Sequence, residues 1–228
     1  MSDELVYDVE WYAPGWEGLD DSDREYLRKR NGDQLLRDGK GDYDVDRYCA
    51  ERLGLESGMQ RIASIAMLHL GTGNEQMLCG PDEVAILRNF WGVVSRLGWP
   101  SRLITFNGRM ADGPVLHIRS AQLGIECTRN LVPYRYDMSD HCDLAEALNF
   151  QGSVRSNYSL DYWCRRFCIP SPKGGGVDGS KVQALADAGE WKTIGEYCLD
   201  DVRATAALYR KLCDSYLHIF KGGPAVPR

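Results

Sequence analysis

The chain has 228 residues, 43% of them hydrophobic, which suits a single α/β domain with a substantial core. Its net charge of −6 argues against a generally basic surface for nucleic acid, and no apolar run approaches the ~20 residues of a membrane-spanning helix. The acidic start MSDELVYDVE is unlike a signal peptide, so we expect a soluble, cytoplasmic protein without membrane contacts.

The first predicted element is a strand at about residues 4–11, where apolar side chains alternate with others. Asp8 and Glu10 lie two positions apart on it and therefore point to the same face. Two carboxylates held this close repel each other, and a shared proton or a cation must relieve the repulsion. Because Mg²⁺ and Mn²⁺ prefer carboxylate oxygens, the pair is a candidate metal site, although a solvated strand end has the same pattern.

An insertion of about residues 12–47 follows this strand. From Glu17 to Arg47 it carries more Asp and Glu than Lys and Arg, so much of the negative charge resides there. Basic side chains elsewhere are candidates to meet phosphates, although each is also an ordinary surface residue: Arg102, Arg109, Arg119, Arg165, Arg166, Lys173, Lys181 and Lys192.

The middle of the chain mixes strands and helices. Strands are predicted near 60–70, 75–79 and 102–106, and a helix over about 82–97 has one apolar face. Another helix follows Asp112, with short elements around 134–150 and a helix near 159–168. This order predicts an α/β fold with a central mixed sheet and helices on its faces.

The last predicted element is a long helix within Glu190 to Phe220. Tyr197 and Asp201 lie one turn apart on it and face the same direction. A carboxylate there can hold a metal ion while the phenol touches the water that the ion polarises. Taken alone, the pattern also fits an exposed Asp beside a Tyr at the edge of the core.

In this order, the motifs Asp8-x-Glu10, Asn107-Gly-Arg-x-x-Asp112 and Tyr197-x-x-x-Asp201 resemble those of the DnaQ-like 3′→5′ exonucleases, which have the ribonuclease H-like fold. More narrowly, the chain resembles the predicted exonucleases related to the proofreading domain of family B DNA polymerases, over nearly its whole length. Because a tyrosine stands four residues before the last Asp, the chain resembles the tyrosine type of these enzymes, called DEDDy. The histidines at 69, 117, 141 and 218 do not occupy the position of a catalytic His.

The resemblance implies a 3′→5′ exonuclease, a hydrolase of phosphodiester bonds, that uses two divalent ions, Mg²⁺ or Mn²⁺. The metal ligands would be Asp8, Glu10, Asp112 and Asp201, with Asp8 bridging both ions. Tyr197, whose phenol has an ordinary pKa of about 10, would orient the attacking water more than deprotonate it. The expected substrate is nucleic acid with a free 3′ end, preferably single-stranded DNA, with RNA possible.

Substrate-binding candidates follow from the same resemblance. Asn107 is a candidate to hold the terminal nucleotide, although an Asn-Gly pair is also a good turn former. Arg109 lies in the same turn. Ser180 and Lys181 end a glycine-rich segment that begins at Gly174, which we expect to form a flexible loop near the substrate path.

Two positions depart from the family pattern. Trp11 replaces a Thr that commonly follows the first Glu, and Ala111 replaces an aromatic residue before the second-motif Asp. These neighbours lie near the terminal nucleotide in related enzymes, so Trp11 is also a substrate-binding candidate and substrate preference stays open. An exoribonuclease is the alternative, because the metal site does not distinguish sugars. A non-catalytic nucleic-acid-binding module is a third interpretation, but all four carboxylates are present.

We expect one exonuclease domain over residues 1–228, with the insertion at about 12–47 and a flexible tail at about 221–228. The eight cysteines include no Cys-x-x-Cys pair, so we expect reduced and mostly buried thiols. The oligomeric state is not predicted.

Overall fold

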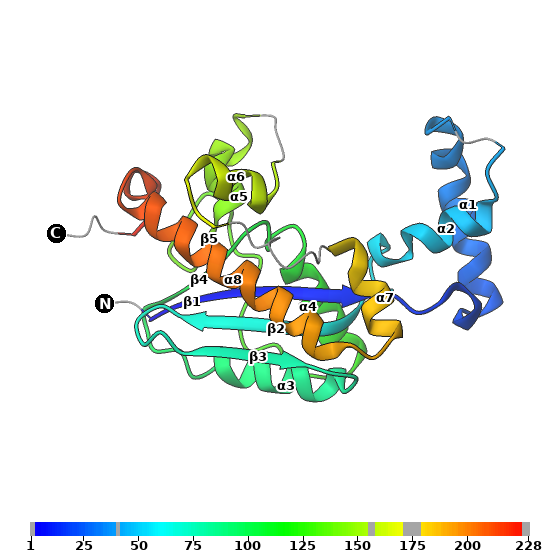
Figure 1. The fold of residues 1–228 in the computed structure, drawn as a ribbon, viewed down its shortest axis with the longest axis horizontal. Helices are drawn as coiled ribbons and strands as arrows, with labels where there is room; N and C mark the ends of the chain where they lie inside the picture. Colours follow the sequence, from blue (N-terminus) through cyan, green and yellow to red (C-terminus); the bar gives the residue numbers. More distant parts are fainter. Residues whose placement is uncertain (1–2, 40–41, 155–157, 171–178, 225–228) are drawn as a thin grey trace.

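A five-stranded mixed sheet forms the centre of the protein (Figure 1). The computed structural model describes residues 3–39, 42–154, 158–170 and 179–224. β1 runs antiparallel to β2 and parallel to β4, which confirms the predicted mixed sheet. The strand order is β3-β2-β1-β4-β5, with bounds β1 (Asp3–Tyr12), β2 (Arg61–His69), β3 (Glu75–Cys79), β4 (Ser101–Thr105) and β5 (His141–Asp143).

Helices cover both faces of this sheet (Figure 1). Leu5 and Tyr7 of β1 are buried in the cluster that contains α3 and α4, whereas Val6 is buried in the cluster that contains α8. Because side chains alternate along a strand, Asp8 and Glu10 share the face of Val6 and lie beside α8. The three helices are α3 (Glu83–Val94), α4 (Asp112–Gln122) and α8 (Trp191–Cys213).

Shorter helices surround the core. Val182 and Ala186 of α7, a helix that the sequence did not predict, pack with Ala63 and Ile194. The remaining helices near the sheet are α5 (Leu144–Leu148), α6 (Leu160–Arg166) and α7 (Val182–Asp187). Single-turn 3-10 helices are η1 (Trp16–Gly18), η2 (Leu53–Leu55), η3 (Phe150–Gly152), η5 (Gly179–Lys181) and η6 (Leu217–Ile219).

The predicted acidic insertion folds into two helices, α1 (Asp21–Arg37) and α2 (Val45–Arg52), which lie beyond the end of β1 (Figure 1). Two of its acidic residues make contacts within the insertion. Asp20 caps α1 by accepting a hydrogen bond from the Asp23 N–H, and Asp46 accepts two from the Arg28 guanidinium. A small apolar cluster holds the helices together, made of Ala13, Leu19, Leu27, Cys49 and Leu53.

Arg102 of β4 is buried, with 8% of its surface exposed. Its Nη1 lies 2.9 Å from Glu4 Oε1 and 3.0 Å from the Tyr209 hydroxyl, and its Nη2 donates to the Gly222 carbonyl. The expectation that Arg102 meets phosphates is therefore wrong. Gly222 belongs to the predicted tail, of which residues 225–228 lie outside the described residues.

All eight cysteines are free thiols, and five of them are buried. Within the described part of the chain, none of the helices is long and apolar enough to cross a membrane.

Candidate active site

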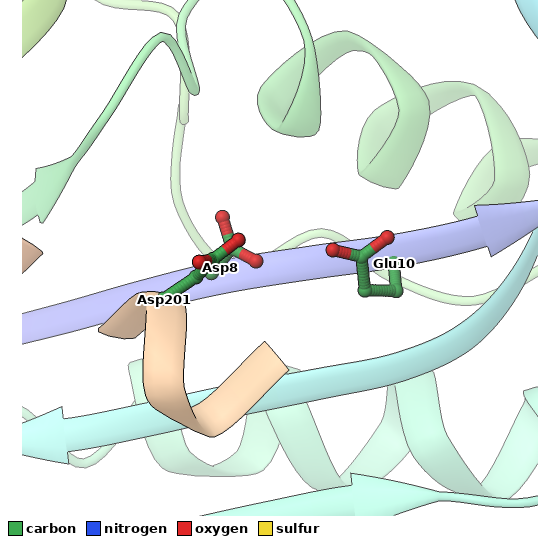
Figure 2. A group of neighbouring side chains, drawn as sticks. All are labelled: Asp8, Glu10 and Asp201. Atoms are coloured by element: carbon green, nitrogen blue, oxygen red, sulfur yellow. The ribbon is translucent and has the colours of Figure 1, made fainter. Parts of the chain in front are cut away.

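Three carboxylates meet where α8 crosses β1. Oxygen atoms of Asp8, Glu10 and Asp201, one from each side chain, all lie within 4.8 Å of one another. Figure 2 shows Asp8 and Glu10 on the strand and Asp201 reaching them from the helix. The strand alternation and the helix position predicted from the sequence thus bring three of the four candidate metal ligands together.

Asp112, the fourth candidate ligand, begins α4 and lies beside this cluster without being part of it. Its carboxylate is buried, and Oδ2 has no hydrogen-bond partner in the structure. An unsatisfied buried acceptor costs about 1–3 kcal/mol. A divalent cation that contacted this oxygen would remove that cost, so Asp112 fits the ligand set.

The carboxylates raise one another's pKa. Burial raises the pKa of Asp8 well above its ordinary value, and the charges of Asp112, Glu10 and Asp201 raise it further. The pKa of Glu10 is raised by burial, then by Asp201 and Asp112. Burial also raises the pKa of Asp112, followed by the charges of Asp143 and Asp201. Such a group of hard oxygen donors is the kind of site that Mg²⁺ or Mn²⁺ occupies.

Tyr197 lies one turn before Asp201 on α8, as predicted. Burial raises the pKa of its phenol above the ordinary value, and the charges of Asp201, Glu10 and Asp8 and a hydrogen bond to Asp201 raise it further. The phenol is therefore neutral at physiological pH and keeps its proton.

A cleft of about 790 Å³ opens beside these residues. Tyr197 and Asp201 line one part of it, and the rest comes from the segment after β4, from Arg135, and from residues 145–149 and 158–163. Its lining consists of Phe106, Asn107, Met110, Arg135, Ala145, Glu146, Asn149, Tyr158, Ser159, Leu160, Asp161, Trp163, Tyr197 and Asp201. Polar and aromatic side chains thus lie next to the carboxylates.

Asn107 lies in a turn, as the Asn-Gly pair predicts, and it also lines the cleft. Its φ of 64° is in the left-handed region, which Asn tolerates better than most residues. The next position, Gly108, requires a glycine, because a Cβ there would lie 2.6 Å from side-chain atoms of Thr105. The Asn-Gly pair therefore makes a turn that presents Asn107 to the cleft.

Two other substrate-binding candidates make contacts within the protein. The Arg109 Nε lies 2.9 Å from Glu146 Oε2, and its Nη1 donates to the Pro133 carbonyl, so its charge is compensated internally. The Trp11 indole donates to the Gly54 carbonyl at 3.0 Å, which joins β1 to η2, the turn after α2. These contacts favour structural roles for both residues.

Ser180 and Lys181 lie in η5 and are not among the described residues that line the cleft. Residues 174–178 of the predicted glycine-rich loop lie outside the described residues, as does Lys173. His141 is a packing residue as expected: burial lowers its pKa to about 3, and its ring nitrogens bond to Thr105 Oγ1 and the Leu131 carbonyl.

Sequence reasoning missed two features of the site. One is the aromatic part of the cleft, where Tyr158 stacks on Tyr162 with ring centroids 4.2 Å apart and meets Trp163 edge-on. The other is Asp143, a buried carboxylate at the end of β5. The spacing Asp143-x-x-Glu146 resembles a helix-capping signature, which could have revealed its cap but not its contacts with other segments.

A mixed sheet flanked by helices, with acidic side chains from β1 and α8 clustered beside α4, defines an α/β domain of the ribonuclease H-like class. Over residues 55–216 the chain matches the family described as "Predicted 3'-5' exonuclease related to the exonuclease domain of PolB", and it belongs to that family. The family description makes the protein a predicted 3′→5′ exonuclease. Asp112, Tyr197 and Asp201 fall within the matched residues.

The fold is similar to that of the family B DNA polymerase from the hyperthermophilic archaeon Pyrobaculum calidifontis. The TM-score is 0.62 at 19% sequence identity, over 93% of this chain and 24% of the polymerase chain. At that identity the likeness concerns the fold, and the chain spans about a quarter of the polymerase's length. No curated protein sequence matches the chain.

Proposed function

We propose that the protein is a metal-dependent 3′→5′ exonuclease that shortens single-stranded nucleic acid, DNA in the first place, from its free 3′ end. The observation that carries this proposal is the meeting of the Asp8, Glu10 and Asp201 carboxylates within 4.8 Å, beside a cleft. The proposal treats the whole chain as one exonuclease domain that carries the α1–α2 insertion.

Asp8, Glu10 and Asp201 are the residues that would hold divalent ions, and the unpartnered Oδ2 of Asp112 supports it as a fourth ligand. In sites of this kind, two bound divalent ions make water nucleophilic and stabilise the oxygen that leaves. The chain itself supplies the negative charge that retains such ions and the rigid elements, β1 and α8, that fix the ligand oxygens.

Tyr197 would orient the attacking water. Its phenol belongs to the same helix face as Asp201 and stays protonated, because burial and the neighbouring carboxylates raise its pKa. A neutral phenol accepts and donates hydrogen bonds but is a poor base at neutral pH. Tyr197 would therefore fix the direction of attack on phosphorus without removing the proton.

The cleft suits unpaired bases. Tyr158 lines it with 44% of its surface exposed, and Trp163 and Phe106 add further aromatic surface. Stacking of a base on an aromatic side chain is worth about 1–3 kcal/mol and requires that the base be free of its duplex partner. This composition supports a single-stranded substrate.

The test is digestion of 5′-labelled single-stranded oligonucleotides by the purified protein with Mn²⁺ or Mg²⁺. We expect a ladder of products shortened one nucleotide at a time, loss of activity in EDTA, and no comparable cutting of closed single-stranded circles. DNA and RNA of the same sequence are compared in parallel, and faster digestion of RNA would replace the DNA assignment with an exoribonuclease. Failure of the wild-type protein to shorten either polymer, with Asp8→Ala as the background, would refute the proposal.

A further inference from the structure

Asp143 is a buried carboxylate at the carboxyl end of β5, where it joins two segments. Its oxygens accept hydrogen bonds from the main-chain N–H groups of Asn107 and Arg109, both at 2.9 Å. They also accept from the N–H groups of Ala145 and Glu146, at 3.0 and 3.4 Å, and so cap α5. One side chain thus ties the Asn107–Asp112 turn to the start of α5.

We propose that Asp143 is a positioning residue of the active site, which holds the Asn107–Asp112 turn so that Asp112 faces the carboxylates of β1 and α8. The activity measurement that tests this inference rests on the proposed function. The measurements of Mn²⁺ binding and of amide exchange do not require the protein to be active.

Hydrogen bonds carry this restraint from the anchored residues to Asp112. The Ala111 N–H donates to the Asn107 carbonyl at 3.1 Å, and the Gly113 N–H donates to the Gly108 carbonyl at 2.7 Å. Asp112 lies between these two bonded positions. Its backbone is therefore fixed on both sides once Asn107 and Arg109 are anchored by Asp143.

The turn has little room to adopt a second arrangement. A Cβ on Gly108 would lie 2.6 Å from Thr105, and a Cβ on Gly113 would lie 2.9 Å from the Val132 side chain. Such close packing means that a shift of the turn requires neighbouring side chains to move. The restraint by Asp143 thus acts on a segment that packing already confines.

The chemistry of the contact explains why a carboxylate stands here. Four N–H groups converge on two acceptor oxygens, whereas Asn offers one acceptor oxygen and Ser one hydroxyl. A neutral side chain would be enough to cap α5, and it would not place a second negative charge beside Asp112. The carboxylate is explained instead by the additional N–H groups of the turn, which need its second oxygen. Glu146 adds a parallel link, because its carboxylate pairs with the Arg109 guanidinium of the same turn.

The main test compares Asp143→Asn with the wild-type protein. The amide keeps the volume and one acceptor oxygen, but its NH₂ group cannot accept from the turn. Loss of a partner that orients a ligand typically lowers metal affinity or activity 10–100-fold. We therefore expect Mn²⁺ affinity by calorimetry, or the single-turnover rate at saturating Mn²⁺, to fall about 10–100-fold. The amides of Ala111 and Gly113 should also exchange hydrogen faster than in the wild type.

Asp82→Asn is the matched control, because Asp82 caps α3 through the Ala85 N–H and, among the described residues, no hydrogen bond joins its side chain to the turn. It should lose stability as a cap variant does while keeping Mn²⁺ affinity, the single-turnover rate and slow exchange at residues 107–113. Asp143→Ala removes both oxygens and should show the larger effect; if it fails to fold, Asp143→Asn decides the matter.

Wild-type Mn²⁺ affinity, single-turnover rate and exchange at the turn in Asp143→Asn would overturn the inference. An inactive wild-type protein would instead refute the proposed function, and metal affinity and amide exchange would then decide the role of Asp143 alone.

Discussion

The thiol of Cys198 lies 3.3 Å from the main-chain oxygen of Asp8 and 3.5 Å from its carboxylate Oδ2. This contact joins the middle of α8 to the central strand in the interior of the protein. Asp201 is three residues further along the same helix, so the contact fixes the distance between two candidate metal ligands.

Cys198→Ala should therefore impair metal binding more than its small loss of volume suggests. We expect a loss of about 1–2 kcal/mol in the free energy of unfolding and weaker Mn²⁺ binding, because the helix loses a hydrogen bond to the strand. Cys198→Ser, which restores a donor, should recover much of the Mn²⁺ affinity. Equal Mn²⁺ affinities of the alanine variant and the wild type, measured by calorimetry, would show that the thiol only fills space.

Removing a candidate ligand should abolish cleavage and leave the fold intact. Asp8→Ala or Asp201→Ala should show no detectable shortening of a 5′-labelled strand, while the circular dichroism spectrum stays that of the wild type. The fold survives because removing one of several repelling carboxylates from a metal-free site relieves repulsion. Near-normal turnover by either variant would contradict the metal assignment.

Stability in EDTA should depend on pH through the same carboxylates. Burial and neighbouring charges raise the pKa of Asp8, so the native state retains a proton that the unfolded chain releases above its ordinary pKa of about 4. The free energy of unfolding therefore falls as pH rises from about 4 through the raised native pKa. Asp8→Asn lacks this loss, so it should gain stability relative to the wild type between pH 5 and pH 8.

Thermal unfolding of both proteins at each pH measures that difference. Comparing the two proteins cancels the opposite effect of His141, whose pKa is lowered to about 3 by burial and whose contribution is lost as pH falls. Added Mn²⁺ should stabilise the wild type more at pH 8 than at pH 5, because ionised carboxylates bind it. A pH-independent difference between the proteins would mean that Asp8 titrates normally.

Tyr197→Phe should separate the phenol from the metal ligands. We expect kcat to fall by about 10–1000-fold through the loss of one placed polar contact, with Mn²⁺ affinity and KM little changed. Asp201→Asn should weaken Mn²⁺ binding itself, since a neutral amide replaces a charged ligand. Calorimetry and single-turnover rates at saturating metal distinguish the two, and a full rate in Tyr197→Phe would exclude its proposed role.

Tyr158→Ala should weaken the binding of single-stranded DNA by about 5–150-fold, which corresponds to the loss of about 1–3 kcal/mol of stacking. Tyr26→Ala is the control, because Tyr26 is equally aromatic and 63% exposed but lies on α1, away from the cleft lining. Fluorescence anisotropy with a labelled oligonucleotide in Ca²⁺ measures both. Similar affinities for the two variants would remove Tyr158 from the substrate path.

The sequence was informative wherever a local repeat determines geometry. The two-residue repeat placed Asp8 and Glu10 on one face, and the helical repeat placed Tyr197 beside Asp201. Within a few residues, the predicted strands and long helices are confirmed. These features depend on backbone periods that each segment contains in itself.

Features that depend on partners distant in the sequence were not predictable in this way. Arg102 looked like a phosphate ligand, yet its partners Glu4 and Tyr209 lie 98 and 107 residues away. The α1 helix was missed because its buried face contains Asn31 between Leu27 and Leu35, which weakens the apolar repeat. Charge and composition do not reveal such pairings; only the fold does.

The contact between Cys198 and Asp8 spans 190 positions of the chain. Because synthesis runs from the amino terminus, Asp8 and Glu10 are made well before Asp201. β1 also needs β2 and β4 beside it before its face is complete. The three carboxylates of the candidate metal site therefore come together only after α8 has docked on β1.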